Sequence, residues 1–208
     1  MKLIAVTAIV GAALAAAATA ATPTLTLAAS SPFVIYGKTA TLTGSLSTLQ
    51  SNQTVTIKAV ECGSTKTTNA ARTKTTANGA YTATVTPVVT TTYQAFQKTV
   101  KSNTVVVAVK PAVGLKRVKR GSFTGSVTAG LDFKGKFLLF QRYAKLRKRW
   151  VQVKKVTLTA STPGTRPTIV STASFKAKAP KLARVRLVLS KAQAAPCYAS
   201  AKSNTVRN

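Results

Sequence analysis

The chain has almost none of the side chains that carry out acid–base or metal chemistry. Among its 208 residues, Glu61 and Asp132 are the only carboxylates, and histidine is absent. A general base or a metal site needs histidine or clustered carboxylates. We therefore expect no catalytic residues, no metal site and no cofactor, and we predict that the protein is not an enzyme.

Lysine and arginine make up nearly all of the charged residues. The chain has 31 Lys+Arg against 2 Asp+Glu, which gives a formal net charge of +29 at pH 7. Cations without carboxylate partners attract anionic polymers over about 8–10 Å at physiological salt. A surface of mixed sign would serve solubility equally well. The bias therefore favours a polyanionic partner, either an anionic cell-wall polymer or an acidic glycan.

The basic residues concentrate in the second half of the chain. Residues 112–208 contain 22 of them, whereas residues 21–111 contain 8. Two clusters and their neighbours are the candidate polyanion-binding residues: Lys116, Arg117, Lys119, Arg120, Arg142, Lys145, Arg147, Lys148, Arg149, Trp150, Lys154 and Lys155. The second cluster is expected at an exposed hairpin tip, where cations can converge on one ligand. Taken alone, each cluster also fits a simply solvated, charged turn.

The N-terminal residues predict export. Lys2 is followed by an uncharged, alanine-rich run over 3–18, and Ala18-Thr19-Ala20 fits an A-x-A cleavage site. This pattern is typical of a secretory signal peptide over residues 1–20, because the apolar run is short for a membrane-spanning helix. We therefore expect a secreted, extracellular protein without a transmembrane segment in its mature chain, retained noncovalently at the cell surface.

Cys62 and Cys197 are the only cysteines. In an exported chain two cysteines suggest a disulfide, and a bridge across a loop of this length would stabilise the fold by roughly 4–5 kcal/mol in the chain-entropy treatment. Two separate, half-buried thiols are the alternative. A catalytic thiol is not expected, because the chain has no histidine to activate it.

Two short motifs occur twice in the same order. Leu42-Thr43-Gly44-Ser45-Leu46 is matched by Phe123-Thr124-Gly125-Ser126-Val127, and Lys101-Ser102-Asn103-Thr104-Val105 returns unchanged at residues 202–206. Such a pattern indicates duplication. It divides the mature chain near Lys110-Pro111 into residues 21–111 and 112–208, with little linker between them. The second unit has extra residues near 144–149 and 161–168.

Short alternating segments rich in Thr, Val and Ala predict an all-β fold. In the first unit they lie near residues 24–28, 33–36, 39–46, 54–60, 81–85, 91–98 and 103–110. Asn78-Gly79 indicates a hairpin turn. In the second unit they lie near 113–118, 121–128, 135–143, 150–160, 169–177, 183–189 and 203–207, with Phe137, Leu139 and Trp150 among the expected core residues. This spacing predicts two antiparallel β-sandwiches.

The chain resembles the bacterial Ig-like domains that occur in tandem on secreted and cell-surface proteins of actinobacteria. The resemblance rests on these stretches, which cover most of the mature chain: Tyr36-Gly37-Lys38-Thr39-Ala40-Thr41-Leu42-Thr43-Gly44, Gln53-Thr54-Val55-Thr56-Ile57, Thr76-Ala77-Asn78-Gly79-Ala80-Tyr81, Thr91-Thr92-Tyr93-Gln94-Ala95, Gly135-Lys136-Phe137-Leu138-Leu139-Phe140-Gln141-Arg142 and Arg149-Trp150-Val151-Gln152-Val153. It implies two tandem immunoglobulin-like sandwiches after a cleaved signal peptide. Members usually act as spacers, stalks or binding modules.

The expected function is a secreted, non-enzymatic structural or adhesive protein that associates electrostatically with anionic cell-envelope polymers. One alternative is a nonspecific binder of extracellular nucleic acid, in which Tyr143 and Trp150 would stack on bases beside phosphate-binding cations. The other alternative is an inert spacer with no specific ligand. The sequence does not predict the oligomeric state.

Overall fold

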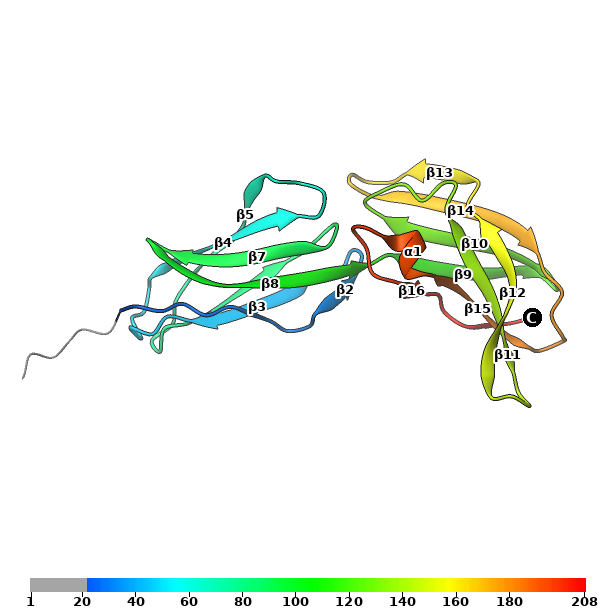
Figure 1. Cartoon of the computed structure of the whole chain (residues 1–208), viewed down its shortest axis with the longest axis horizontal. Coiled ribbons are helices and arrows are strands. Elements are labelled where there is room, and N and C mark those ends of the chain that lie inside the picture. Colours follow the sequence, from blue (N-terminus) through cyan, green and yellow to red (C-terminus); the bar gives the residue numbers. More distant parts are fainter. Residues whose placement is uncertain (1–21) are drawn as a thin grey trace, which may run out of the picture.

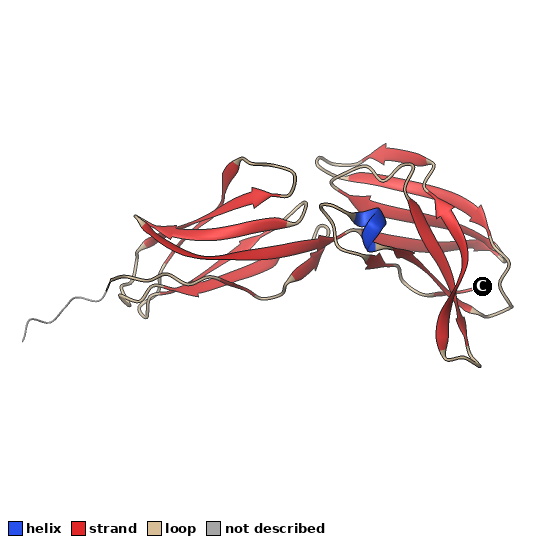
Figure 2. Cartoon of the chain, in the orientation of Figure 1, coloured by secondary structure: helices blue, strands red, loops and turns tan. Residues whose placement is uncertain are grey.

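The computed structural model describes residues 22–208, so the predicted signal peptide lies outside the described residues. The described chain is almost entirely β-strand and forms two sandwich-like units placed end to end (Figures 1 and 2). The first unit contains β1–β8, and the second contains β9–β17 with a four-residue helix. We refer to these as the first unit (residues 22–110) and the second unit (residues 112–208).

The first unit has two sheets. The smaller one has the order β1-β3-β6, with β1 (Ala28–Ala29), β3 (Ala40–Ser45) and β6 (Ala80–Val85). The larger one has the order β2-β8-β7-β4-β5, with β2 (Phe33–Ile35), β8 (Val100–Lys110), β7 (Thr91–Gln97), β4 (Thr54–Glu61) and β5 (Thr67–Lys74). Pairing is antiparallel except between β2 and β8, which run parallel.

The second unit also has two sheets. The first has the order β13-β14-β10-β9, with β13 (Ala160–Pro163), β14 (Ile169–Lys176), β10 (Ser122–Ala129) and β9 (Ala112–Lys119). The second has the order β12-β11-β15-β16, with β12 (Arg149–Thr157), β11 (Phe137–Ala144), β15 (Arg184–Leu189) and β16 (Ala201–Lys202). In addition, β17 (Val206–Arg207) pairs with β15, and α1 (Lys191–Ala194) follows β15.

Alternating side chains of the strands fill the space between the sheets of each unit. In β10 and β15 every second residue is buried, as expected for strands with one face on the core. Phe123 and Phe140 face each other with ring centroids 5.1 Å apart, and Phe175 packs against both rings. The largest fully buried side chains include Tyr81, Leu42 and Ile57 in the first unit.

The motif Lys-Ser-Asn-Thr-Val clamps the N-terminal segment of each unit through its asparagine. The Leu27 N–H donates to Oδ1 of Asn103 (3.0 Å) while Nδ2 of Asn103 donates to the Leu27 carbonyl (2.9 Å). In the second unit the Leu115 N–H donates to Oδ1 of Asn204 (3.0 Å), and Nδ2 of Asn204 donates to the Leu115 carbonyl (3.0 Å). The repeated residues therefore have the same structural task in each unit.

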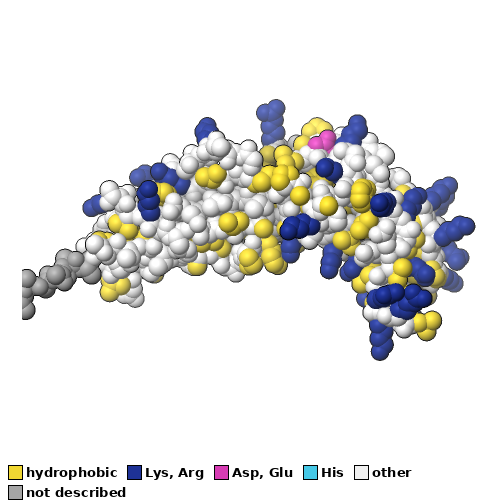
Figure 3. Space-filling model, viewed as in Figure 1, with side chains coloured by type: hydrophobic (Ala, Val, Ile, Leu, Met, Phe, Trp, Pro, Cys, Tyr) yellow, Lys and Arg dark blue, Asp and Glu magenta, His cyan; other side chains and the backbone are white. Residues whose placement is uncertain are grey.

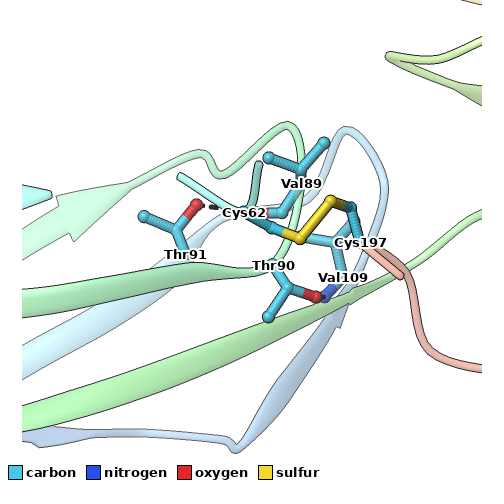
Figure 4. The surroundings of a disulfide bond; sticks show 6 residues. All are labelled: Cys62, Val89, Thr90, Thr91, Val109 and Cys197. Carbon is cyan, nitrogen blue, oxygen red and sulfur yellow. Dashed lines mark hydrogen bonds between the residues drawn. A yellow bond between two sulfur atoms is a disulfide. The ribbon is translucent and has the colours of Figure 1, made fainter. Parts of the chain in front are cut away.

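The junction between the units is held at several points. The chain passes from β8 to β9 through Pro111 alone. A disulfide joins Cys62 to Cys197, with Cα atoms 5.3 Å apart, so the pairing that the sequence left open is present and links the two units (Figure 4). Beside it, the Thr90 N–H donates to the Cys197 carbonyl (3.0 Å) and the Ala199 N–H donates to the Val109 carbonyl (2.8 Å).

Several of the strand expectations were wrong, among them the single strand expected over 203–207, of which only β17 (Val206–Arg207) is a strand. Strand β5 was missed because its sequence, Thr-Thr-Asn-Ala-Ala-Arg-Thr-Lys, lies at a sheet edge and shows no apolar alternation. Asn78-Gly79 does form a turn, but it is not a hairpin, since β5 pairs with β4 and β6 pairs with β3. The single strand expected over 150–160 ends at Thr157, and the chain then crosses to β13 in the opposite sheet.

The residues of β11 that face the core were also predicted incorrectly. Leu138 and Phe140 are fully buried, whereas Phe137 and Leu139 are only partly buried on the outer face. Because residues 137–140 are all apolar, the alternation of apolar and polar residues does not indicate which face of the strand is buried. In β12 the register shifts opposite Phe140 and Gln141, and Val153 is left 37% exposed at this irregularity.

Candidate polyanion-binding surface

The far end of the second unit, away from the junction, is hollowed by an open groove. Its cavity volume is about 1010 Å³. Five segments line it, from the β9–β10 turn, β11, β12, the end of β14 with the stretch that follows it, and residue 208: Arg120, Gly121, Arg142, Val151, Gln152, Val153, Lys176, Ala177, Lys178, Ala179, Pro180 and Asn208. We call this cavity the first groove.

The first groove combines apolar and cationic residues. Arg120, Arg142, Lys176 and Lys178 supply the positive charges, while neither Glu61 nor Asp132 lines the cavity. Valine, alanine and proline side chains supply the apolar part of the lining. Cations beside low-dielectric walls concentrate the electrostatic field, so the groove attracts anions more strongly than a flat surface with the same charge would.

Asn208 holds two walls of this groove together. Its Oδ1 accepts a hydrogen bond from the Gly121 N–H (2.8 Å), and its Nδ2 donates to the carbonyls of Ala179 (2.5 Å) and Pro180 (3.3 Å). The side chain is buried and 3% exposed. It therefore fixes the β9–β10 turn against the segment that follows β14.

A second, smaller groove continues from the first and shares Arg142 and Pro180 with it. Its volume is about 380 Å³, and its lining comes from the end of β11 with the residue that follows it and from the loop that leads into β15: Arg142, Tyr143, Ala144, Lys145, Pro180, Lys181, Leu182, Ala183 and Arg184. Three further cations, Lys145, Lys181 and Arg184, thereby extend the positive surface. Figure 3 shows Lys and Arg side chains gathered over this end of the molecule.

The β11–β12 hairpin forms the tip of this end. Arg147, Lys148 and Arg149 are exposed at its turn, where Lys148 has a φ of 46° and its N–H donates to the Lys145 carbonyl (3.2 Å). These three cations are not part of either groove lining. They stand beyond it, at the end of the hairpin.

Trp150 is packed by arginine instead of lying open. The Arg186 guanidinium lies 4.0 Å from the centroid of the Trp150 ring, and Arg184 lies 4.8 Å from that of Tyr143. The two rings meet edge to face at 5.5 Å. Nε of Arg186 also donates to Oε1 of Gln141 (3.0 Å), and partial burial lowers the pKa of the Arg186 guanidinium. Aromatic faces thus stabilise cations that have no carboxylate partner.

The other residues predicted from sequence lie around the grooves. Lys116, Arg117 and Lys119 are exposed on edge strand β9, and the Arg117 guanidinium donates to the Arg207 carbonyl (3.3 Å). The Lys154 ammonium donates to the Lys176 carbonyl (3.3 Å), and Lys155 lies over the Phe137 ring at 4.9 Å. Of the twelve predicted residues, only Arg120, Arg142 and Lys145 line a groove.

Sequence reasoning missed five cations of this surface: Lys176, Lys178, Lys181, Arg184 and Arg186. They were overlooked because they are spread over β14, a loop and β15 and do not form a consecutive run. The sequence signal that could have identified them is the recurrence of a basic residue every two or three positions.

Asp132 serves a structural purpose. Its Oδ1 accepts hydrogen bonds from the hydroxyls of Ser161 and Ser171 and from the Lys134 N–H (2.7 Å). The Ser161 hydroxyl, followed by the Lys134 N–H, lowers the pKa of this carboxyl group. The anion is therefore stabilised, which makes it a weak general base.

No family model matches the sequence, and no curated protein is similar to it. Within residues 22–208, no helix is long and apolar enough to cross a membrane.

Proposed function

We propose that this chain is a secreted, non-enzymatic structural or adhesive protein, built from two tandem Ig-like domains, that associates electrostatically with anionic cell-envelope polymers. The observation that carries the proposal is the joining of cations from three separate stretches of the chain, near residues 120, 142–145 and 176–184, around two continuous grooves at one end of the second unit. Wall polymers of the teichoic type and acidic glycans present repeated anions along a flexible chain, which fits an extended groove better than a closed pocket.

The architecture supports a spacing role for the rest of the molecule. Each unit has two facing sheets, and the repeated Asn103 and Asn204 clamps occupy the same place in both. The cross-linked junction holds the first unit at the end of the second unit that lies opposite the grooves. In this arrangement the second unit binds and the first unit extends away from the bound surface.

The packing of Trp150 argues against nucleic acid as the main ligand. Base stacking needs a free aromatic face, but the Arg186 guanidinium covers one face of Trp150 and the Tyr143 ring packs against it edge to face. Nonspecific contacts to phosphate remain expected from the charge alone. Because a stiff duplex cannot follow the groove as a flexible wall polymer can, we expect duplex DNA to dissociate at a lower salt concentration than the wall polymer.

The test measures retention of the purified mature protein on isolated anionic wall polymer and on duplex DNA across a salt series. A quadruple variant, Arg120→Gln, Arg142→Gln, Lys176→Gln and Lys178→Gln, should lose about tenfold or more in affinity for the polymer and show a shallower salt dependence. The matched control removes four exposed charges from the first unit: Lys38→Gln, Lys66→Gln, Lys74→Gln and Lys98→Gln. Equal losses in the two variants would contradict a localised site, and no binding of the wild type would contradict the function.

A further inference from the structure

The tip of the β11–β12 hairpin presents an unprotected leucine between cations. Leu146 is 101% exposed, so no other part of the described chain covers its side chain. Lys145 precedes it, and Arg147, Lys148 and Arg149 follow it, all of them exposed. Figure 1 shows this tip standing clear of the body of the second unit, so it can reach a surface that the sheets themselves do not touch.

A second exposed apolar residue lies beside the same hairpin, close to its turn. Leu182 is 58% exposed and lines the smaller groove together with Tyr143, Ala144 and Lys145. Its backbone has a φ of 61°, an uncommon conformation for leucine that directs the loop after Pro180. Two exposed leucines, surrounded by lysine and arginine side chains, therefore lie at one end of the molecule.

From this geometry we propose that the hairpin tip inserts Leu146 into the interfacial layer of a bilayer that contains anionic lipids. The inference rests on the proposed association with an anionic envelope and identifies the lipid surface as a partner. A soluble polyanion needs only the cations, whereas burial of a leucine side chain is favourable only in an apolar medium.

The dimensions and the order of residues along the hairpin fit this interface. Cations beside Leu146 would lie at the lipid phosphates, since clustered Lys and Arg are attracted to anionic headgroups. The Tyr143–Trp150 pair is three residues further up the strand, roughly 10 Å from the tip at about 3.3 Å per residue. Aromatic residues favour this boundary between headgroups and water, and apolar side chains of interfacial segments enter about 5–10 Å.

The experiment compares vesicles of phosphatidylcholine alone with vesicles that also contain phosphatidylglycerol, and includes soluble glycerol phosphate polymer as the lipid-free arm. Leu146→Ser should weaken binding to the anionic vesicles by about ten- to a hundredfold, as expected from loss of one buried leucine. Binding to the soluble polymer should stay within about twofold. The matched control is Leu49→Ser, which removes an exposed leucine (63%) from the first unit.

A fluorescence measurement tests insertion directly. Trp150 is the only tryptophan, so Leu146→Trp in a Trp150→Phe background places one reporter at the tip. Its emission should shift to shorter wavelength with anionic vesicles and remain unchanged with soluble polymer.

Unchanged vesicle binding by Leu146→Ser, or an unshifted tip tryptophan, would overturn the insertion while the polymer arm still supported the proposed function. A wild-type protein that bound neither vesicles nor polymer would overturn both.

Discussion

Gly44 and Gly125 occupy the same position in the two repeated motifs but face different neighbours. A Cβ atom at Gly44 would collide with the Thr26 carbonyl oxygen and the Tyr81 ring, whose hydroxyl donates to that same carbonyl. A Cβ atom at Gly125 would lie 2.7 Å from Cδ1 of Leu187. The first obstacle is backbone and a buried ring, whereas the second is the end of a flexible side chain.

We expect Gly44→Ala to lower the free energy of unfolding by about 3 kcal/mol and Gly125→Ala by about 1 kcal/mol, because Leu187 can adjust its rotamer and the Thr26 backbone cannot. Urea unfolding followed by circular dichroism measures both. Gly164→Ala is the control, since its Cβ would make only ordinary contacts with Thr168. A larger loss for Gly125→Ala would contradict this account.

The asparagine clamps give a second prediction. Asn204→Ala should destabilise the second unit by about 2 kcal/mol, because it leaves the N–H and the carbonyl of buried Leu115 without partners. Asn103→Ala should have the same effect on the first unit through Leu27. Asn69→Ala, at an exposed position on β5, should be nearly neutral in the same denaturation measurement. Unchanged stability of the Asn204 variant would show that water replaces the clamp.

Removal of the disulfide should loosen the junction. The combined change Cys62→Ser and Cys197→Ser should lower the unfolding free energy by about 2–5 kcal/mol, with the chain-entropy value for a loop of this length at the upper end. It leaves the β8–β9 connection and hydrogen bonds such as Ala199 N–H to the Val109 carbonyl (2.8 Å) to set the angle between the units. Small-angle X-ray scattering should then show a broader distribution of molecular lengths, and an unchanged distribution would mean that these contacts are sufficient.

Asp132 should make stability sensitive to acid. The Ser161 hydroxyl and the Lys134 N–H hold the pKa of its carboxyl group below the usual range, which is about 4 in an unfolded chain. A lowered folded-state pKa contributes stability that is present above pH 4 and is lost as the pH falls through the folded value. Denaturation midpoints measured below pH 4 should therefore fall in the wild type and fall less in Asp132→Asn. Parallel curves would contradict this role.

Alternation in the sequence predicts a strand where one face is buried and the other is wet, as in β10 and β15. It fails for β5, which is exposed along most of its length, and for the Phe137–Phe140 run, where both faces are apolar. Local runs of charge predicted the hairpin tip. The grooves could not be predicted in this way, because Arg120, Arg142 and Lys176 meet only through the pairing of distant strands.

The cross-link between the units also determines which parts of the chain carry mechanical load. Tension applied at the two ends of the protein passes from residue 62 to residue 197 through sulfur, bypassing a sequence separation of 135 residues. That segment would otherwise extend by roughly 450 Å at about 3.3 Å per residue. It contains Arg120, Arg142, Lys176 and Lys178. A pulled molecule can therefore lose its outer segments, including Asn208 and its contacts to the groove walls, while the chain that contains these four cations is protected from extension.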